Sequence, residues 1–472
     1  MVFSSITFLA YFLPIVLIAY FIVPKSWRRY KNAVLLLSSL VFYACSGVRY
    51  LLLMLAVILT DYLCGLLCGF GRTRSIKKLG VIAAVVISLG LLGWFKYAGF
   101  FSENLSALGL PIPVVSIVLP VGLSFYSFQG LSYVVDVYRE QAAVQKNPCK
   151  VALYAALFPQ LVAGPIVRYT TIAEEIDCRQ ENLTDFSEGL TRFCFGLGKK
   201  MLLANAMGEI ADAVYGYAAA TLPAGLAWIG ALAYTLQIYF DFSAYSDMAI
   251  GLGRIFGFHF LENFNYPYIS KTVTEFWRRW HISLSSWFRD YLYIPLGSNR
   301  CSRLKNIRNL TIVWLLTGLW HGASWTFVVW GAWFLVFLLG EKFLWGRILE
   351  KLPAPIRWGY TMLIVIISWV FFRSSSLTNA WAFLKSMLGL GGGIQASAAI
   401  YYLLEYWPEW ICALIACMPV KQWLQSALER KGTPLCQALL IWGPKVLALI
   451  LLLASYMKLV TGSFNPFIYF QF

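Results

Sequence analysis

The chain has 472 residues, of which 60% are hydrophobic and only 13% are charged. A soluble domain carries about 25% charged residues, so this composition excludes an ordinary soluble protein and predicts a polytopic membrane protein. The net charge of +16 does not indicate nucleic-acid binding here, because most basic residues flank apolar runs, where positive-inside sorting and anionic lipid explain them.

Residues 6–23 form the first apolar run. No basic residue precedes this run, and no small-residue cleavage site follows it before Lys25. We therefore interpret it as a retained helix and not as a cleaved signal peptide. The basic residues that follow are Lys25, Arg28, Arg29 and Lys31. Because such residues mark the cytoplasmic side of a membrane, the N-terminus is expected outside.

Apolar runs and basic clusters then alternate along the chain. Residues 34–44 and 51–70 predict a helical hairpin, residues 81–101 are expected to cross outward, and residues 114–137 to return. The loops on the expected cytoplasmic side carry two further basic clusters, Arg72, Arg74, Lys77 and Lys78 in one and Arg139, Lys146 and Lys150 in the other. Three successive clusters fit one alternating topology.

The segment 151–167 contains Pro159 and the pair Gly164-Pro165. These residues interrupt a helix, so the segment predicts a broken or re-entrant element. A helical stretch at 186–203 follows it.

A second helical stretch covers residues 224–253, and the polar residues at 239–247 are expected to interrupt it. Residues 261–310 are rich in Lys and Arg, with aromatic residues at helical intervals. This pattern predicts amphipathic helices that lie at the cytoplasmic interface.

Further spans are predicted at residues 312–320, 326–339, 356–372, 398–418 and 439–459. A glycine-rich break at 389–393 and a basic loop with Lys421, Arg430 and Lys431 are expected to join the later ones. The count reaches about a dozen membrane-embedded elements. We expect residues 1–472 to form a single integral-membrane domain.

His321 lies within one of these apolar runs, and the chain has only three histidines. An ionisable ring at membrane depth costs a few kcal/mol when charged, on the order of 3 kcal/mol, and is usually kept for function. A desolvated imidazole stays neutral and can act as a general base or acid. Its small neighbours Gly318, Gly322 and Ala323 are expected to let a substrate approach. The alternative is a structural histidine bonded to a nearby carbonyl.

His281 lies in the basic, Trp-rich segment upstream. It is either a second functional histidine or an interfacial residue on a solvated face. Nearby Arg278, Arg279 and Arg289 are candidates for holding the phosphates of a donor such as coenzyme A. The alternative is that these arginines anchor phospholipid headgroups.

Asp241 and Asp247 lie in the expected interruption of the helical stretch at 224–253. Carboxylates there face a cavity, a partner helix or a metal, and helix–helix hydrogen bonding is the simpler interpretation. His259 is read as a loop residue. Cys64 and Cys68 lack further metal ligands nearby, so no metal site is expected.

Several motifs resemble those of the membrane-bound O-acyltransferase family, in particular its alginate O-acetyltransferase membrane-subunit branch. They are MVFSS (1–5), GLSFY (122–126), FPQLVAGP (158–165), YFDFSAYSDMAIGLG (239–253), EFWRRWHISLS (275–285), LWHGA (319–323) and NPFIYF (465–470). The resemblance is strongest over about residues 1–375, and the C-terminal helices at about 376–472 follow the family less closely.

The resemblance implies an all-α fold in which a ring of membrane helices surrounds a central funnel and tunnel. His321 and His281 match the two family histidines and are implied to be catalytic. Trp320, Arg278, Arg279, Arg289, Asp241 and Asp247 are weaker candidates for binding donor or substrate. The implied reaction moves an acyl group, expected to be acetyl, from a cytoplasmic thioester such as acetyl-CoA to an extracytoplasmic glycan. No cofactor is expected, and delivery is direct or through a membrane-anchored partner acyltransferase outside a bacterial cytoplasmic membrane.

Three alternatives remain open at this point. Relatives that transfer D-alanine to teichoic acid share the histidines but use a carrier-protein donor. A transporter or flippase without acyl chemistry would also suit the buried aspartates and the broken element. A scaffold whose extracellular partner is the true catalyst is the third. The acceptor is left open among alginate-like polysaccharide, peptidoglycan and other glycans.

Overall fold

The computed structural model describes residues 1–162, 164–392, 397–462 and 464–468. Helices make up 77% of the structure, and the described residues contain no strand, which confirms the all-α class. The helices fall into two compact units, the first formed by residues 1–193 and 246–261 and the second by residues 194–245 and 262–472. The ring of helices and the single domain stay predictions.

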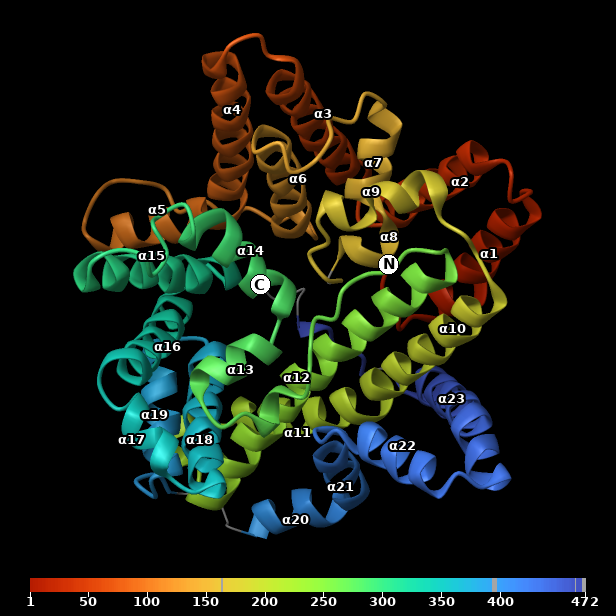
Figure 1. Cartoon of the computed structure of the whole chain (residues 1–472). Helices are drawn as coiled ribbons and strands as arrows, with labels where there is room; N and C mark the ends of the chain where they lie inside the picture. Colours follow the sequence, from red (N-terminus) through yellow and green to blue (C-terminus); the bar gives the residue numbers. More distant parts are fainter. Residues whose placement is uncertain (163, 393–396, 463, 469–472) are drawn as a thin grey trace. The chain divides into compact units, whose positions relative to one another are not determined.

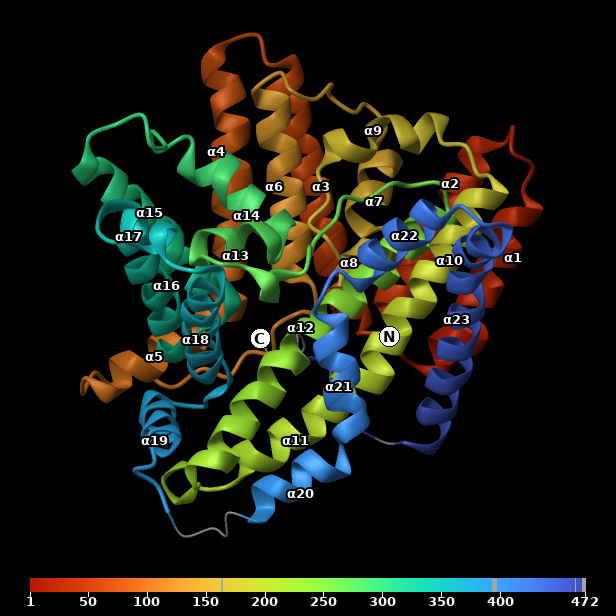
Figure 2. The same cartoon turned by 60° about the horizontal axis from the view of Figure 1, so that its bottom comes forward.

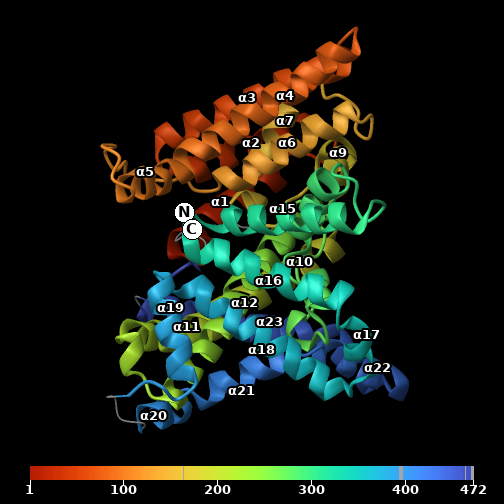
Figure 3. The ribbon, with the colours of Figure 1, turned by 90° about the vertical axis from the view of Figure 1, so that its left-hand side faces the viewer.

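The first unit contains the amino-terminal helices. In chain order they are η1 (Thr7–Phe12), α1 (Leu13–Ile22), α2 (Arg28–Ala44), α3 (Val48–Phe70), α4 (Arg74–Leu92), η2 (Gly93–Tyr97), α5 (Ala98–Ala107), α6 (Leu123–Tyr138), α7 (Pro148–Ala156), α8 (Phe158–Leu161) and α9 (Tyr169–Cys178). Helices α3, α4 and α6 pack side by side as a bundle (Figures 1 and 3). The long helices α10 (Leu183–Gly198) and α12 (Ala224–Ile255) contribute residues to both units.

Two proline-rich segments decide where helices of this unit begin and end. The predicted span at 114–137 is helical only from Leu123, because Pro113 and Pro120 lack the N–H group that would continue a helix. The predicted break in 151–167 is confirmed, since α7 ends at Ala156 and a separate short helix follows. Residue 163 of that motif lies outside the described residues.

A buried ion-pair cluster ties α2 to the loop between α9 and α10. The Arg28 and Lys31 side chains lie 2.6 and 3.4 Å from Glu181 Oε1, and the Tyr20 hydroxyl donates to the same carboxylate. Burial by itself raises the pKa of such a carboxyl, but hydrogen bonds from Arg28 and Tyr20 lower the pKa of Glu181 to about 2. Glu181 is therefore ionised at neutral pH and balances part of the basic cluster.

The other two basic clusters also find acidic partners within the first unit. Lys77 Nζ lies 3.4 Å from a carboxylate oxygen of Glu140, at the C-terminal end of α6. Lys150 Nζ lies 2.7 Å from Asp177, close in sequence to Glu181. Each of the three basic clusters is therefore paired with an acidic residue of the same unit, and their common location on one side of a membrane stays a prediction.

The second unit holds the remaining helices. They are η3 (Lys199–Ala204), α11 (Asn205–Gly216), η4 (Ala219–Thr221), η5 (Pro267–Ile269), α13 (Val273–Arg279), α14 (Ile282–Phe288), η6 (Arg289–Tyr293), α15 (Arg303–His321), α16 (Trp325–Phe343), α17 (Gly346–Lys351), α18 (Ala354–Arg373), α19 (Leu377–Met387), α20 (Ser397–Glu405), α21 (Trp407–Ala416), α22 (Val420–Lys431) and α23 (Pro434–Thr461).

Three predictions on these helices are wrong. Helix α12 is continuous through residues 239–247, because Asp241 and Asp247 each pair with a basic side chain instead of breaking the helix. The predicted basic loop is the helix α22. The predicted span 398–418 is two helices that meet near Tyr406, where Pro408 disfavours a continuous helix. Residue 393, the last residue of the glycine-rich break expected at 389–393, lies outside the described residues.

Helices α15 and α16 cross at very short range (Figure 2). A Cβ atom on Gly331 would lie 2.5 Å from the carbonyl oxygen of Trp314, and one on Gly318 would collide with the carbonyl oxygen of Phe327. Only glycine at both positions lets the two backbones approach so closely.

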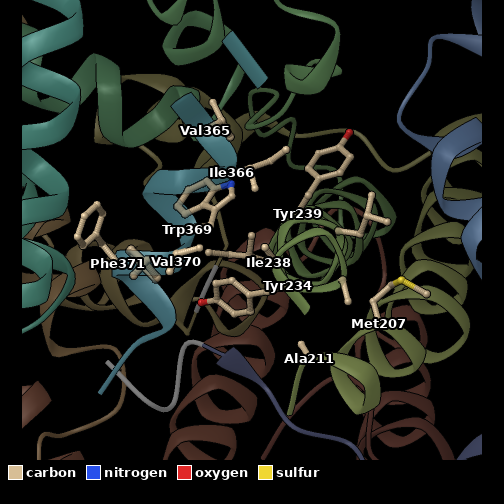
Figure 4. Packing of buried hydrophobic residues seen from close by; sticks show 14 of the residues in the cluster. Met207, Ala211, Tyr234, Ile238, Tyr239, Val365, Ile366, Trp369, Val370 and Phe371 are labelled. Carbon is tan, nitrogen blue, oxygen red and sulfur yellow. The ribbon is translucent and has the colours of Figure 1, made fainter. Parts of the chain in front are cut away.

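The core of the second unit is rich in aromatic residues. Figure 4 shows Tyr234 and Ile238 of α12 turned toward Trp369 and Val370 of α18. Trp369 is 1% exposed and Val370 is also 1% exposed. This packing between α12 and α18 forms one side of the candidate site described below.

Five segments of the described residues are long and apolar enough to cross a membrane. They are Val48–Phe70, Arg74–Ala107, Trp325–Phe343, Ala354–Arg373 and Pro434–Thr461. Helices α21 and α22, bent by 68° at their junction, add a sixth if they form one broken span. These segments confirm a multi-pass membrane protein.

We expect Gly318→Ala to destabilise the protein by about 1–3 kcal/mol, because the added methyl group pushes α15 and α16 apart. Gly359→Ala is the matched control, since a Cβ atom at this helical position meets nothing within 4 Å and alanine favours a helix by up to about 1 kcal/mol. Thermal unfolding of both variants in detergent micelles measures the difference. Equal midpoints for the two variants would contradict the close crossing.

Candidate active site

His321 is the last residue of α15 and is only 5% exposed. Aromatic rings surround its imidazole, with ring centroids 4.9 Å away in Trp330, 5.2 Å away in Phe372 and 5.0 Å away in Trp320. The C-terminal carbonyl groups of a helix carry partial negative charge, which favours a positive charge formed on a ring at this place. The geometry therefore suits an imidazole that accepts a proton during a reaction.

A cavity adjoins His321 and has a volume of ≈ 10 Å³, which is room for about one water molecule. Its other lining residues are Ile238, Phe242, Trp280, Trp369, Phe372 and Ile468. Apart from the imidazole and the Trp indole N–H groups, the described residues of this lining have no polar side-chain group. The cavity is therefore a dry, closely fitted space that must widen before an acyl group and its acceptor can meet at His321.

The glycines beside His321 do not leave space for a substrate, which was the role expected from the sequence. The space beside Gly318 is filled by the Phe327 backbone, and the space beside Gly322 by the Phe327 ring. Both glycines therefore allow α15 and α16 to pack, and neither leaves room for a substrate. The cavity reaches His321 from the α12 and α18 side instead.

His281 is completely buried, which excludes the solvated interfacial face considered above. Its backbone has φ = 44°, an uncommon conformation for a non-glycine residue. The ring packs 4.6 Å from Phe242 and 6.1 Å from Trp320, measured between ring centroids. Phe242 lines the cavity and Trp320 contacts the His321 ring, so each connects the surroundings of the two histidines.

Hydrogen bonds assign the tautomer of His281. The Asn263 Oδ1 atom accepts hydrogen bonds from the Ser283 backbone N–H at 3.1 Å and the Ser283 hydroxyl at 2.9 Å. The same oxygen lies 3.1 Å from His281 Nδ1, so Nδ1 carries the proton and donates. Among the described residues Nε2 has no hydrogen-bond partner, which leaves its lone pair available as an acceptor.

Burial lowers the pKa of His281 from 6.5 to about 3. The cause is desolvation, because moving a charged imidazole ring from water into an apolar interior costs free energy. His281 is therefore neutral at physiological pH and serves as a hydrogen-bonding group, not as a cation that binds phosphate.

The three candidate arginines do not line the cavity. Arg278 is exposed. Arg279 pairs with Glu275 at 3.0 Å, and Arg289, whose side chain is 63% exposed, pairs with Asp290 at 2.7 Å. The structure thus places them at the surface of α13, α14 and η6, and a role in donor binding stays a prediction.

The two candidate aspartates lie in different units and make different ion pairs. Asp247 lies 2.8 Å from Arg192 in the first unit. Asp241 lies 2.7 Å from Lys200 in the second unit, with both side chains almost fully buried. Asp241 Oδ2 also accepts the backbone N–H of Ile468 at 2.8 Å. Asp241 therefore reaches the cavity indirectly, through a residue that lines it.

Comparison with known proteins relates this geometry to a family. The sequence profile of the membrane-bound O-acyltransferase family matches residues 129–378, which include His281 and His321. The chain is also 40% identical to the probable alginate O-acetylase AlgI of Azotobacter vinelandii, over 513 aligned positions that cover all of both chains. The chain belongs to the membrane-bound O-acyltransferase family.

The names of two further relatives indicate different acceptors. The peptidoglycan O-acetyltransferase of Helicobacter pylori is 34% identical, with 83% of this chain and 80% of the relative covered. The teichoic acid D-alanyltransferase of Bacillus subtilis is 28% identical, with 55% of this chain and 68% of the relative covered. The chain is an O-acyltransferase, as its family and these O-acetylating relatives support.

Several residues at the candidate site of this membrane-bound O-acyltransferase were not singled out from the sequence, among them the following three. Asn263 assigns the tautomer of His281, Lys200 pairs with Asp241, and Ile468 lines the cavity. The sequence does contain a signal for Lys200, because it directly precedes an apolar stretch and a buried lysine needs an acidic partner. Ile468 lies in the C-terminal motif at 465–470, but nothing in that motif indicates a place at the cavity. Asn263 gave no signal, because its role depends on contacts with residues distant in the sequence. Residues 469 and 470 of the C-terminal motif lie outside the described residues.

We expect stability to fall with pH below 6.5 because of His281. The unfolded chain takes up a proton near its ordinary pKa of about 6.5 while the folded ring stays neutral, so stability falls by up to about 1.4 kcal/mol per pH unit. Relative to His281→Phe, the wild type should therefore lose about 2 kcal/mol between pH 8 and pH 5. Unfolding in detergent micelles at several pH values measures this. A constant difference between the two proteins would show that the buried ring is not held neutral.

Proposed function

We propose that this O-acyltransferase transfers an acetyl group from a cytoplasmic thioester, acetyl-CoA, to a hydroxyl group of an extracytoplasmic glycan. Transfer is direct or passes through a membrane-anchored acyltransferase on the outer side of a bacterial cytoplasmic membrane. The observation that carries the proposal is the buried His321 imidazole beside a dry, aromatic cavity. Full-length similarity to O-acetylases supports the class of acyl group and acceptor.

In the proposed reaction His321 removes the proton from the attacking hydroxyl group. The hydroxyl oxygen forms a bond with the acyl carbon, the bond from that carbon to the thioester sulfur breaks, and the proton passes from the imidazole to the leaving thiolate. Because the cavity is small and its lining is mostly apolar, little water is admitted beside His321, and competition from hydrolysis is limited.

His281 is proposed to assist the reaction at His321 without transferring the proton itself. Its Nδ1 proton is engaged by Asn263, so only Nε2 can accept a hydrogen bond. Phe242 and Trp320 contact the His281 ring, and Trp320 also contacts the His321 ring. We assign His281 the role of orienting the donor or the aromatic wall, and His321 the proton transfer.

The proposed side of donor entry follows from the basic residues. Each of the three basic clusters of the first unit pairs with an acidic residue, Glu181, Glu140 or Asp177. Positive-inside sorting supports a cytoplasmic location for these clusters and an N-terminus outside. A negatively charged donor such as acetyl-CoA would be attracted to the same side.

The cavity lining favours acetyl over D-alanyl transfer. A D-alanyl group carries an ammonium ion, which needs an acidic or other polar partner in a buried site. In the part of the chain that the structure describes, no acidic residue lines the cavity, and Asp241 is already paired with Lys200. An acetyl group presents only a methyl group and a carbonyl, which suits this lining.

We expect His321→Ala to lower the acetylation rate by about 10²–10⁴-fold, since it removes the general base. Membranes from cells that make the protein in its native setting are supplied with labelled acetyl-CoA, and free thiol and base-labile acetyl on glycan are measured. His259→Ala is the matched control, because His259 is an exposed residue bonded to Glu175 in the first unit. Acetylation that survives His321→Ala would refute the proposal, and glycan movement without acetylation would favour a transporter.

A further inference from the structure

The C-terminal segment Phe464–Ile468 is held by buried polar groups of the second unit. The Ile468 N–H donates to Asp241 Oδ2 at 2.8 Å. Lys200 Nζ donates to the Pro466 carbonyl, and Asn205 Nδ2 donates to the Phe464 carbonyl at 3.2 Å. Three hydrogen bonds from three different positions therefore fix the path of this segment.

The Lys200–Asp241 ion pair is the centre of this arrangement. Its Nζ and Oδ1 atoms are 2.7 Å apart, and the side chains are 3% and 2% exposed. A buried ion pair is stable only when further hydrogen bonds satisfy its remaining donors and acceptors. The backbone of the C-terminal segment supplies these bonds on both sides, to the lysine at Pro466 and to the aspartate at Ile468.

The same contacts place Ile468 at the cavity beside His321. Ile468 is 4% exposed and lines the cavity. Its aliphatic neighbour in the lining is Ile238, and the other hydrophobic lining residues are aromatic. Among these, Trp369 packs against both Trp280 and Phe372. Ile468 is therefore the cavity residue whose position depends on a short segment and an ion pair, not on a packed helix.

We propose that Ile468, held in place by Lys200 and Asp241, is the wall that limits the transferred acyl group to two carbons. This inference rests on the proposed acetyl transfer. The cavity, with a volume of ≈ 10 Å³, must already widen to admit an acetyl group, so each further carbon of a longer acyl chain requires a further displacement of the lining side chains. Lys200 and Asp241 are positioning residues in this proposal, because they act through Ile468 and do not touch the acyl group.

The first test changes the size of the wall. Ile468→Ala removes three carbon atoms, whereas a propionyl group exceeds acetyl by one carbon and a butyryl group by two. Membranes from cells that make the protein in its native setting receive acetyl-, propionyl- and butyryl-CoA at equal concentration, and mass spectrometry measures the acyl groups on the glycan.

The wild type should prefer acetyl over propionyl by about 10-fold or more, the discrimination that one methylene group provides. Ile468→Ala should reduce this ratio to within about 3-fold, because the added carbon then has space. Ile468→Val, which removes one carbon, should give an intermediate ratio and guards against misfolding of the alanine variant. Ile364→Ala is the matched control, since Ile364 is buried in the same core but does not line the cavity.

The second test removes the Lys200–Asp241 ion pair that holds the C-terminal segment. Asp241→Asn leaves the Lys200 charge without its counter-charge, so the C-terminal segment should shift and the acetyl-to-propionyl ratio should fall toward that of Ile468→Ala. Asp212→Asn removes another ion pair of the same unit, formed with Arg373 at 2.6 Å, and should keep the wild-type ratio. A lower rate at an unchanged ratio in Asp241→Asn would refute the positioning role.

The outcomes separate the two proposals. A wild type that transfers acetyl while Ile468→Ala and Ile468→Val keep its acyl ratio would overturn the role of Ile468 and leave the proposed function intact. A wild type that consumes none of the three thioesters would overturn the proposed function itself.

Discussion

The close crossing of α15 and α16 is the contact on which the candidate site depends. Gly318 and Gly331 let the two backbones approach, and this approach brings Trp330 of α16 against His321 at the end of α15. Helices in lipid associate through close packing of small residues, because lipid and side chains are equally apolar. The same packing that stabilises the helix pair therefore also determines where the imidazole lies.

A second constraint is that each charge kept inside an apolar interior needs a partner. Glu181 is matched by Arg28 and Lys31, and Asp241 by Lys200. His281 meets the same requirement differently, since burial keeps its ring neutral and Asn263 Oδ1 accepts a hydrogen bond from its Nδ1–H group. Polar groups near the site are thus held in single arrangements, which favours a pre-organised active site.

Much of the site could be predicted from the residues, and the failures have identifiable causes. An isolated histidine in an apolar run costs free energy and is usually kept for a function. The sequence therefore predicts a role for His321, which does line a buried cavity. Its glycine neighbours were misinterpreted, because spacing alone cannot distinguish a gap for substrate from a gap filled by Phe327. The interruption expected in α12 was wrong because the partners of Asp241 and Asp247 lie about 40 to 55 residues away.

The sequence alone determined that the chain is a multi-pass, all-α membrane protein with two functional histidine candidates. It did so because composition, apolar run length and short motifs are local properties of the chain. Only the tertiary structure decided that His281 is fully buried, that the arginines stay at the surface, and that Ile468 lines the cavity. These features arise from contacts between segments far apart in sequence, such as Asp241 with Ile468, and no local pattern records which partners will meet.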